Sequence, residues 1–197
     1  KCNDEYPEIL IYSVPVTDFI SSDKFRSRAL GMLVDRIKVI NCSSVSYISI
    51  ACNTAHILLP QLQKISKTPF VSMIDETTKY VYENKREKVG LMGTPSMIKY
   101  GLYQIALSNY GISTIIPTQG EIASLEKIIF NILKGKNFNC DRKRLVSIAD
   151  SLKKKGAQGI ILGCTELPLV FPKKYPLPVY NSVEILAMAL LQKYYAK

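Results

Sequence analysis

The 197-residue sequence lacks the features that mark several classes of protein. No stretch approaches the roughly 18 consecutive apolar residues of a membrane-spanning helix, and no secretory signal precedes the first apolar segment. The five cysteines are odd in number and widely spread, without the CxxC spacing of zinc sites or the density of a disulfide framework. We therefore expect a cytoplasmic protein with reduced thiols, no bound metal and no membrane association.

A nucleic-acid-binding motif is also absent, although positive charge is abundant. Lys and Arg outnumber Asp and Glu by 26 to 16, which gives a net charge of +10. These basic residues are scattered over predicted helix ends and loops, where solvated charge is the ordinary arrangement. Because no recognition module accompanies them, we predict no nucleic-acid partner. With 47% hydrophobic and 21% charged residues, the composition is that of an ordinary globular protein.

Predicted strands and helices alternate along the chain. Short apolar segments rich in β-branched residues predict strands at 8–14, 47–51, 69–74, 88–92, 113–117, 160–163 and 179–180. Helical periodicity and capping residues predict helices at 22–41, 53–67, 75–84, 95–109, 141–155 and 183–195, with a further one around Ile122–Ile132. Strands that alternate with helices call for a parallel sheet covered by helices on both faces.

Two cysteines stand at corresponding places in two similar segments. The first segment reads YISIACNTAH and contains Cys52, and the second reads GIILGCTEL and contains Cys164. In each, an apolar strand runs into the cysteine and polar side chains follow it. A thiol at a helix N-terminus meets unpaired N–H groups and the positive end of the helix dipole. We therefore predict a thiolate at Cys52 with a pKa well below the usual value of roughly 8.5.

The motifs ACNTAH and GCTEL resemble the paired cysteine motifs of the aspartate/glutamate racemase family. The Gly-Thr-Pro turn at Gly93 and the order of elements extend the resemblance over essentially the whole chain. It implies an α/β fold of two pseudo-symmetric lobes, each a parallel sheet flanked by helices, with the active site in the cleft between them. The expected lobes are residues 1–80, completed by a C-terminal helix at 181–197, and residues 85–180. The first lobe is expected to lack the family's first strand and helix.

The family resemblance also implies a reaction, which is racemisation of an amino acid without a cofactor; aspartate is the first expected substrate and glutamate the second. Cys52 and Cys164 are the expected catalytic bases: one thiolate removes the α-proton while the opposite thiol donates one. Polar groups at the strand-to-helix turns and one lysine are the expected substrate-binding residues: Asn53, Thr54, Thr94, Thr165 and Lys134. The implied partners are a small amino-acid substrate and a second copy of the chain in a homodimer.

Several residues and the activity itself keep alternative interpretations at this stage. His56 is expected to support the site rather than act as a base, and Glu166 either caps its helix or orients Cys164. Lys134 either binds the substrate or complements the dipole at a helix C-terminus. A related racemase or isomerase acting on another small carboxylate is an alternative function. An inactive ligand-binding homologue is another, because the first strand of the family pattern is missing.

Overall fold

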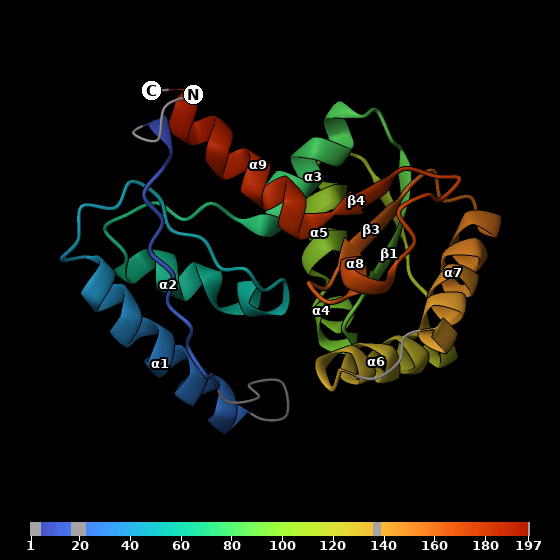
Figure 1. Ribbon diagram of the computed structural model, residues 1–197, viewed down its shortest axis with the longest axis horizontal. Helices are drawn as coiled ribbons and strands as arrows, with labels where there is room; N and C mark the ends of the chain where they lie inside the picture. The colour runs from blue at the N-terminus through green and yellow to red at the C-terminus, as the bar shows by residue number, and fades with distance from the viewer. Residues whose placement is uncertain (1–4, 17–22, 136–138, 197) are drawn as a thin grey trace. The chain divides into compact units, whose positions relative to one another are not determined.

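A computed structural model describes residues 5–16, 23–135 and 139–196, and the chain divides into two compact units (Figure 1). The first unit comprises the described parts of Lys1–Ser49, Leu58–Val71 and Ala187–Lys197, and the second comprises Ile50–Ile57 and Ser72–Leu186. Residues 50–57 and 72–80, which the expected lobe boundaries assign to the first lobe, therefore group with the second unit by their contacts.

The second unit is built around a parallel four-stranded sheet in the order β2-β1-β3-β4. The strands are β1 (Lys88–Gly93), β2 (Ser113–Ile115), β3 (Ile160–Gly163) and β4 (Val179–Asn181). In the centre of the sheet, Leu91 pairs with Ile161 and Gly93 with Gly163, so β1 and β3 end side by side. This sheet confirms the predicted α/β class and the strands expected at 88–92, 160–163 and 179–180.

Helices cover both faces of this sheet, as Figure 1 shows. They are α3 (Met73–Glu83), α4 (Pro95–Lys99), α5 (Leu102–Ser108), α6 (Gln119–Leu133), α7 (Asn139–Lys154), α8 (Leu167–Val170) and the start of α9 (Ser182–Tyr195). Side chains of successive strand residues point to opposite faces. Accordingly Ile160 and Leu162 pack with α6 and α7, whereas Leu91 and Ile161 pack with α3 and α5.

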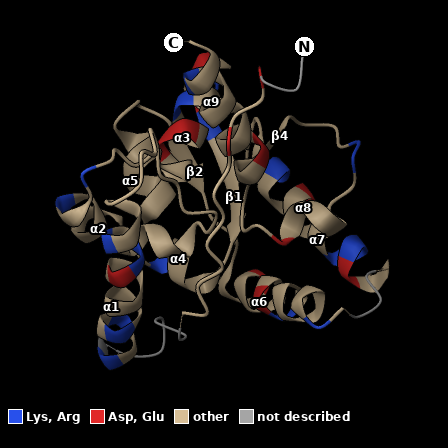
Figure 2. Cartoon of the chain, turned by 60° about the vertical axis from the view of Figure 1, so that its left-hand side comes forward, with Lys and Arg blue, Asp and Glu red and all other residues tan. Residues whose placement is uncertain are grey.

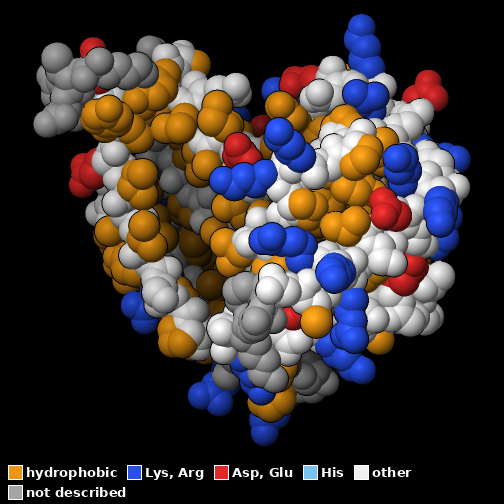
Figure 3. All heavy atoms as spheres, turned by 45° about the vertical axis from the view of Figure 1, so that its right-hand side comes forward, with side chains coloured by type: hydrophobic (Ala, Val, Ile, Leu, Met, Phe, Trp, Pro, Cys, Tyr) orange, Lys and Arg blue, Asp and Glu red, His pale blue; other side chains and the backbone are white. Residues whose placement is uncertain are grey.

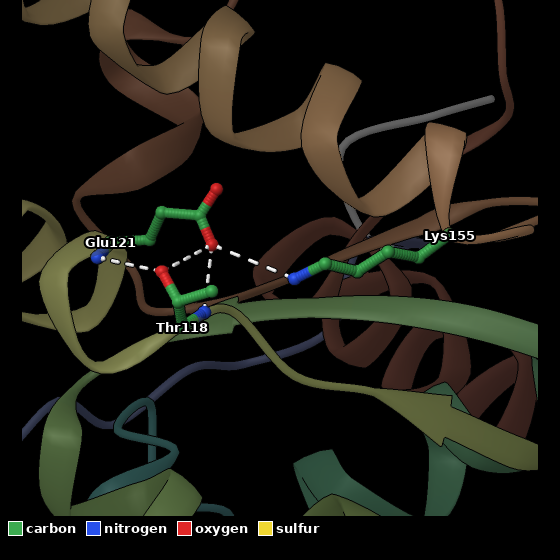
Figure 4. Close-up of polar contacts among 3 residues, drawn as sticks. All are labelled: Thr118, Glu121 and Lys155. Carbon is green, nitrogen blue, oxygen red and sulfur yellow. Dashed lines mark hydrogen bonds and ion pairs between the residues drawn. The ribbon is translucent and has the colours of Figure 1, made fainter.

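Helix starts in this unit follow their capping residues. Thr94 accepts a hydrogen bond from the Met97 N–H and Pro95 takes the first helical position of α4, as the sequence predicts. At α6, Thr118 and Glu121 form a capping box, and Lys155 lies 3.8 Å from Glu121 Oε2 (Figure 4). Such caps satisfy N–H groups that have no partner inside the helix.

The single helix predicted over 95–109 is instead two helices. Gly101 has a φ of 66°, a left-handed conformation that glycine adopts without strain, and it separates α4 from α5. The helical periodicity on either side of Gly101 carries no sign of this break.

The first unit contains α1 (Asp23–Ile40), η2 in part (Thr54–Leu58, a 3₁₀ helix shared with the second unit), α2 (Leu59–Ile65) and the end of α9. The predicted strand at 8–14 is wrong: the structure assigns no strand there, and Ile9 and Ile11 are 72% and 83% exposed. A β-branched apolar sequence forms a strand only where another strand pairs with it.

In place of the predicted strands at 47–51 and 69–74, the structure has a single parallel bridge between Ile48 and Phe70. The second of them ends early because Ser72 caps α3, accepting a hydrogen bond from the Asp75 N–H, and Met73 is already helical.

Charged side chains are distributed over many elements. Figure 2 shows Lys and Arg on several helices and connecting segments with Asp and Glu among them, and Figure 3 shows basic side chains spread over much of the face drawn, with a few acidic ones between them. None of the helices in the described ranges is long and apolar enough to cross a membrane.

Candidate active site

Both cysteines of the paired motifs lie in the second unit, and so do the other residues that the sequence predicts for the site. Cys164 follows β3 directly and is 5% exposed, while Cys52 is half-buried just before the 3₁₀ helix η2. Cys42, Cys52, Cys140 and Cys164 are all free thiols, as predicted for the cysteines within the described residues.

The Cys52 thiol receives hydrogen bonds from the backbone N–H groups of Thr54 and Ala55. These bonds favour the thiolate, as expected for the start of a helix, although the helix here is 3₁₀ rather than α. The predicted low pKa is nevertheless wrong. Burial, the largest effect, raises the pKa of Cys52 above its ordinary value, and the charge of Glu166 raises it further.

His56 is held by hydrogen bonds at both ring nitrogens. The Met73 N–H donates to Nε2 at 2.9 Å, so Nε2 carries no proton. Nδ1 therefore carries the proton of the neutral ring and donates it to the Cys52 carbonyl oxygen, also at 2.9 Å. Burial lowers the pKa of His56, which keeps the ring neutral. His56 thus bonds to the backbone at Cys52 and at Met73, and its supporting role stays a prediction.

Glu166 accepts two hydrogen bonds from the residues before it. The Cys164 thiol and the Thr165 hydroxyl both donate to Oε2, each at 2.9 Å. Burial and then the Glu166 charge raise the pKa of Cys164, and this hydrogen bond raises it further because the thiol must keep its proton to donate. Of the two interpretations left open for Glu166, this contact favours the one in which it orients Cys164, since α8 has no side-chain cap.

The two thiols share one electrostatic environment. The Glu166 charge acts on both of them, and the charge of Cys52 acts on Cys164. These two cysteines lie 112 residues apart in the sequence (164 − 52), yet the Glu166 charge acts on the pKa of each.

Two threonine hydroxyls meet beside Cys52. Thr54 Oγ1 and Thr94 Oγ1 are 2.9 Å apart, and Thr94 also accepts the Met97 N–H. Each hydroxyl carries one proton and their mutual bond uses only one of the two. One hydroxyl proton therefore remains for an acceptor such as a carboxylate.

Asn53 is 2% exposed and bonded at both ends of its amide. Tyr103 donates to Asn53 Oδ1 at 2.7 Å, and Asn53 Nδ2 donates to Ser182 Oγ at 3.1 Å. Sequence reasoning missed Tyr103 and Ser182. The sequence does offer one signal, a serine at the strand-to-helix junction after Tyr180-Asn181, where an N-terminal residue of a helix often bonds to nearby backbone.

The residues around the cysteines leave few candidates for a metal site. Across residues 5–16, 23–135 and 139–196, no group of three or more His, Cys, Asp or Glu side chains is placed to hold a metal ion.

A model of the Asp/Glu/Hydantoin racemase family matches residues 1–190. The chain belongs to this family. It is 23% identical over 193 residues to the broad specificity amino-acid racemase RacX of Bacillus subtilis, an alignment that covers 98% of this chain and 84% of RacX. The protein is thus an amino-acid racemase of this family, an isomerase, as the paired motifs predict.

Solved structures of the family share the fold of this racemase. An aspartate racemase homologue from Pyrococcus horikoshii is similar with a TM-score of 0.84 at 28% identity, covering 96% of this chain and 84% of that chain. The aspartate racemase of Picrophilus torridus gives a TM-score of 0.83 at 26% identity, covering 98% and 82%. A glutamate racemase from Francisella tularensis, at 18% identity and a TM-score of 0.68, shares the fold alone.

Lys134 of the racemase lies at the C-terminal end of α6 and is exposed. Its Nζ stands 4.3 Å from the centre of the Phe130 ring, a cation–π contact on the same helix. The helix itself contacts α4, whose N-cap is Thr94. The predicted role of Lys134 in substrate binding stays a prediction.

Proposed function

We propose that this racemase inverts the α-carbon of an acidic amino acid with the thiols of Cys52 and Cys164 acting from opposite sides. The observation that carries the proposal is that the Cys164 thiol donates to Glu166 at 2.9 Å, while the Glu166 charge raises the pKa of both Cys164 and Cys52. Two-base racemisation needs one deprotonated and one protonated group near the same carbon. No cofactor is needed for such a step, because the base and the acid are both protein side chains.

The hydrogen bonds suggest different roles for the two thiols. The N–H groups of Thr54 and Ala55 favour a thiolate at Cys52, whereas Cys164 keeps its proton to donate to Glu166. Because burial raises the pKa of Cys52 in the free protein, Cys52 is proposed to become the base once the substrate is bound. It takes the α-proton and becomes a thiol, and Cys164 gives its proton to the opposite face of the carbanion and becomes a thiolate. The substrate ammonium group lowers the pKa of a nearby thiol and so offsets the effect of burial.

The α-carboxylate of the substrate is proposed to bind at the hydroxyls of Thr54 and Thr94, which have one proton to spare between them. Hydrogen bonds to that carboxylate stabilise the charge that develops when the α-carbon loses its proton. Thr165 donates its hydroxyl proton to Glu166 in the free protein, so in this proposal it reaches the substrate through its backbone N–H.

An acidic substrate is supported by the names of the relatives, which include aspartate and glutamate racemases. Lys134 is proposed to bind the side-chain carboxylate after leaving the Phe130 ring. The name of RacX, a broad specificity racemase, supports a wider range of amino acids as the second candidate. Racemase activity on each enantiomer of aspartate, glutamate and several neutral amino acids, followed by chiral chromatography, distinguishes the two.

The test of the two-thiol mechanism uses Cys52→Ala and Cys164→Ala, with Cys140→Ala as the matched control because Cys140 is an exposed free thiol. Each of the first two changes should abolish racemisation and the control should not. Racemisation that survives either change overturns the mechanism. Binding of acidic ligands with no turnover by the unaltered chain would instead favour the inactive homologue.

We also propose a homodimer, which the family resemblance supports. Light scattering on the purified chain checks it, and a monodisperse monomer at working concentration would contradict it.

A further inference from the structure

A chain of buried hydrogen bonds connects the segment of Cys52 with the strand that leads to Cys164. Tyr103 Oη donates to Asn53 Oδ1 at 2.7 Å, Asn53 Nδ2 donates to Ser182 Oγ at 3.1 Å, and Ser182 Oγ donates to the Leu162 carbonyl oxygen at 2.9 Å. The side chains of Tyr103 and Ser182 are completely buried and Asn53 is 2% exposed. The four groups come from α5, the Cys52 segment, the start of α9 and β3.

The donors in this chain follow from what each acceptor can do. The Leu162 carbonyl can only accept, so Ser182 must give it its single hydroxyl proton. Ser182 Oγ is then free only to accept, which orients the Asn53 amide with its nitrogen toward Ser182 and its oxygen toward Tyr103. The Asn53 side chain therefore has one orientation that satisfies all its neighbours. Buried networks in which every group is satisfied are rigid, because each unmade bond costs free energy.

The two ends of the network lie next to the two thiols in the sequence. Asn53 is the residue after Cys52, and its carbonyl also accepts the His56 N–H at 3.1 Å. Leu162 stands two residues before Cys164, in the rigid centre of the sheet, where it pairs with Met92 on one side and Asn181 on the other. The Cys52 segment is thus tied to the same strand that carries Cys164.

We propose that Tyr103 and Ser182 are positioning residues of the racemase: through Asn53 they set the separation of the Cys52 and Cys164 thiols. The inference rests on the proposed two-thiol mechanism. Proton transfer to and from opposite faces of one carbon tolerates little error in that separation, since a displacement of about 1 Å can lower a rate about 100-fold. Both side chains are completely buried, so we expect the removal of either hydroxyl to change the rate of inversion more than the affinity for substrate.

The test compares Tyr103→Phe and Ser182→Ala with the unaltered chain in deuterated solvent. Each substitution removes one hydroxyl, one from each end of the Asn53 amide. We expect kcat for racemisation to fall about 10- to 100-fold with little change in KM. We also expect the ratio of deuterium incorporated with inversion to deuterium incorporated with retention to fall. A carbanion whose opposite thiol is misplaced lives longer, so the thiol that made it exchanges its proton for deuterium from the solvent and then returns deuterium to the same face.

Controls separate positioning from general loss of structure. Tyr110→Phe and Ser108→Ala remove hydroxyls from exposed residues of the same unit, and both should leave kcat and the ratio unchanged. A variant that merely folded less well would lose active molecules without altering the ratio, so an unaltered ratio in both Tyr103→Phe and Ser182→Ala overturns the proposal. If one of the two fails to fold, the other decides.

A failure of the proposed racemase function itself would give a different result from a failure of the positioning proposal. In that case the unaltered chain itself would give neither inversion nor deuterium exchange, and the variants would have nothing to change.

Discussion

Replacing Glu166 by Gln should lower the pKa of the Cys164 thiol. The thiol donates to Glu166 Oε2 at 2.9 Å, so the carboxylate opposes formation of the thiolate both through its charge and through the lost hydrogen bond. Two unit charges at this distance repel by about 1.4 kcal/mol in water and by about 6 kcal/mol at an effective dielectric constant of about 20. Because one pKa unit corresponds to about 1.4 kcal/mol, the range is roughly one to four units.

We expect a decrease near the lower end of this range, about one to two units, because Glu166 is partly exposed and solvent screens its charge. Burial, the largest cause of the raised pKa, remains in the variant. The pKa of Cys164 should therefore stay above its ordinary value even without the carboxylate. The Cys52 pKa should fall as well, but by less, because for that thiol the Glu166 charge is the smallest of the effects.

The assay is the rate of Cys164 alkylation by iodoacetamide as a function of pH, with the modified peptide quantified by mass spectrometry. Only the thiolate reacts, so the midpoint of the rate profile gives the pKa. Glu126→Gln serves as the control, because Glu126 is an exposed carboxylate on α6. A midpoint for Glu166→Gln that equals or exceeds that of the unaltered chain would refute the assigned interaction between Glu166 and Cys164.

Three further predictions concern the support of the site. Burial lowers the pKa of His56, the chain's single histidine, so its NMR titration midpoint should lie below 6.5. The free energy of unfolding should decrease as the pH falls below about 6.5, because there the unfolded histidine gains a proton that the folded one does not. A midpoint at or above 6.5 would contradict this prediction. Gly163→Ala should lower the free energy of unfolding in urea by about 1–3 kcal/mol, because the added Cβ would lie 2.8 Å from the methyl group of Met97. Gly120→Ala is the control, because its added Cβ would meet no neighbouring side chain within 4 Å, and it should not destabilise the fold. Equal stabilities of the two variants would contradict the close packing at Gly163. Thr118→Ala should cost about 0.5–2 kcal/mol in the same assay, because it removes the capping box of α6, and an unchanged stability would argue against that cap.

The strands of the second unit were predictable because their signal is local. A central parallel strand is buried on both faces and so reads as a continuous apolar run, as at Ile160–Gly163. The same signal failed at 8–14, where the apolar sequence has no strand to pair with in the described structure and its side chains face solvent. A strand forms only where a second strand pairs with it, and the sequence of one segment does not show whether such a partner exists.

The site was predictable to a similar extent. The motifs place Cys52 and Cys164 at strand-to-helix turns, and the structure agrees for Cys164, which follows β3, whereas Cys52 follows a segment with a single bridge at Ile48 and precedes a 3₁₀ helix. The protonation of Cys52 did not follow, since it depends on burial by residues distant in the sequence. Tyr103 and Ser182 were missed for the same reason: each becomes a partner of Asn53 only after three separate segments have packed together.

The central claim, that two opposed thiols move the α-proton, is tested most directly by the early pattern of deuterium incorporation from deuterated solvent. With L- or D-aspartate or glutamate as the starting enantiomer and no added cofactor, the account predicts that deuterium appears first in the inverted product, while the recovered substrate keeps its α-proton. Cys52→Ala and Cys164→Ala should each abolish this inversion. Deuterium that enters the recovered substrate as fast as the product would instead indicate a single base serving both faces and would contradict the two-thiol mechanism.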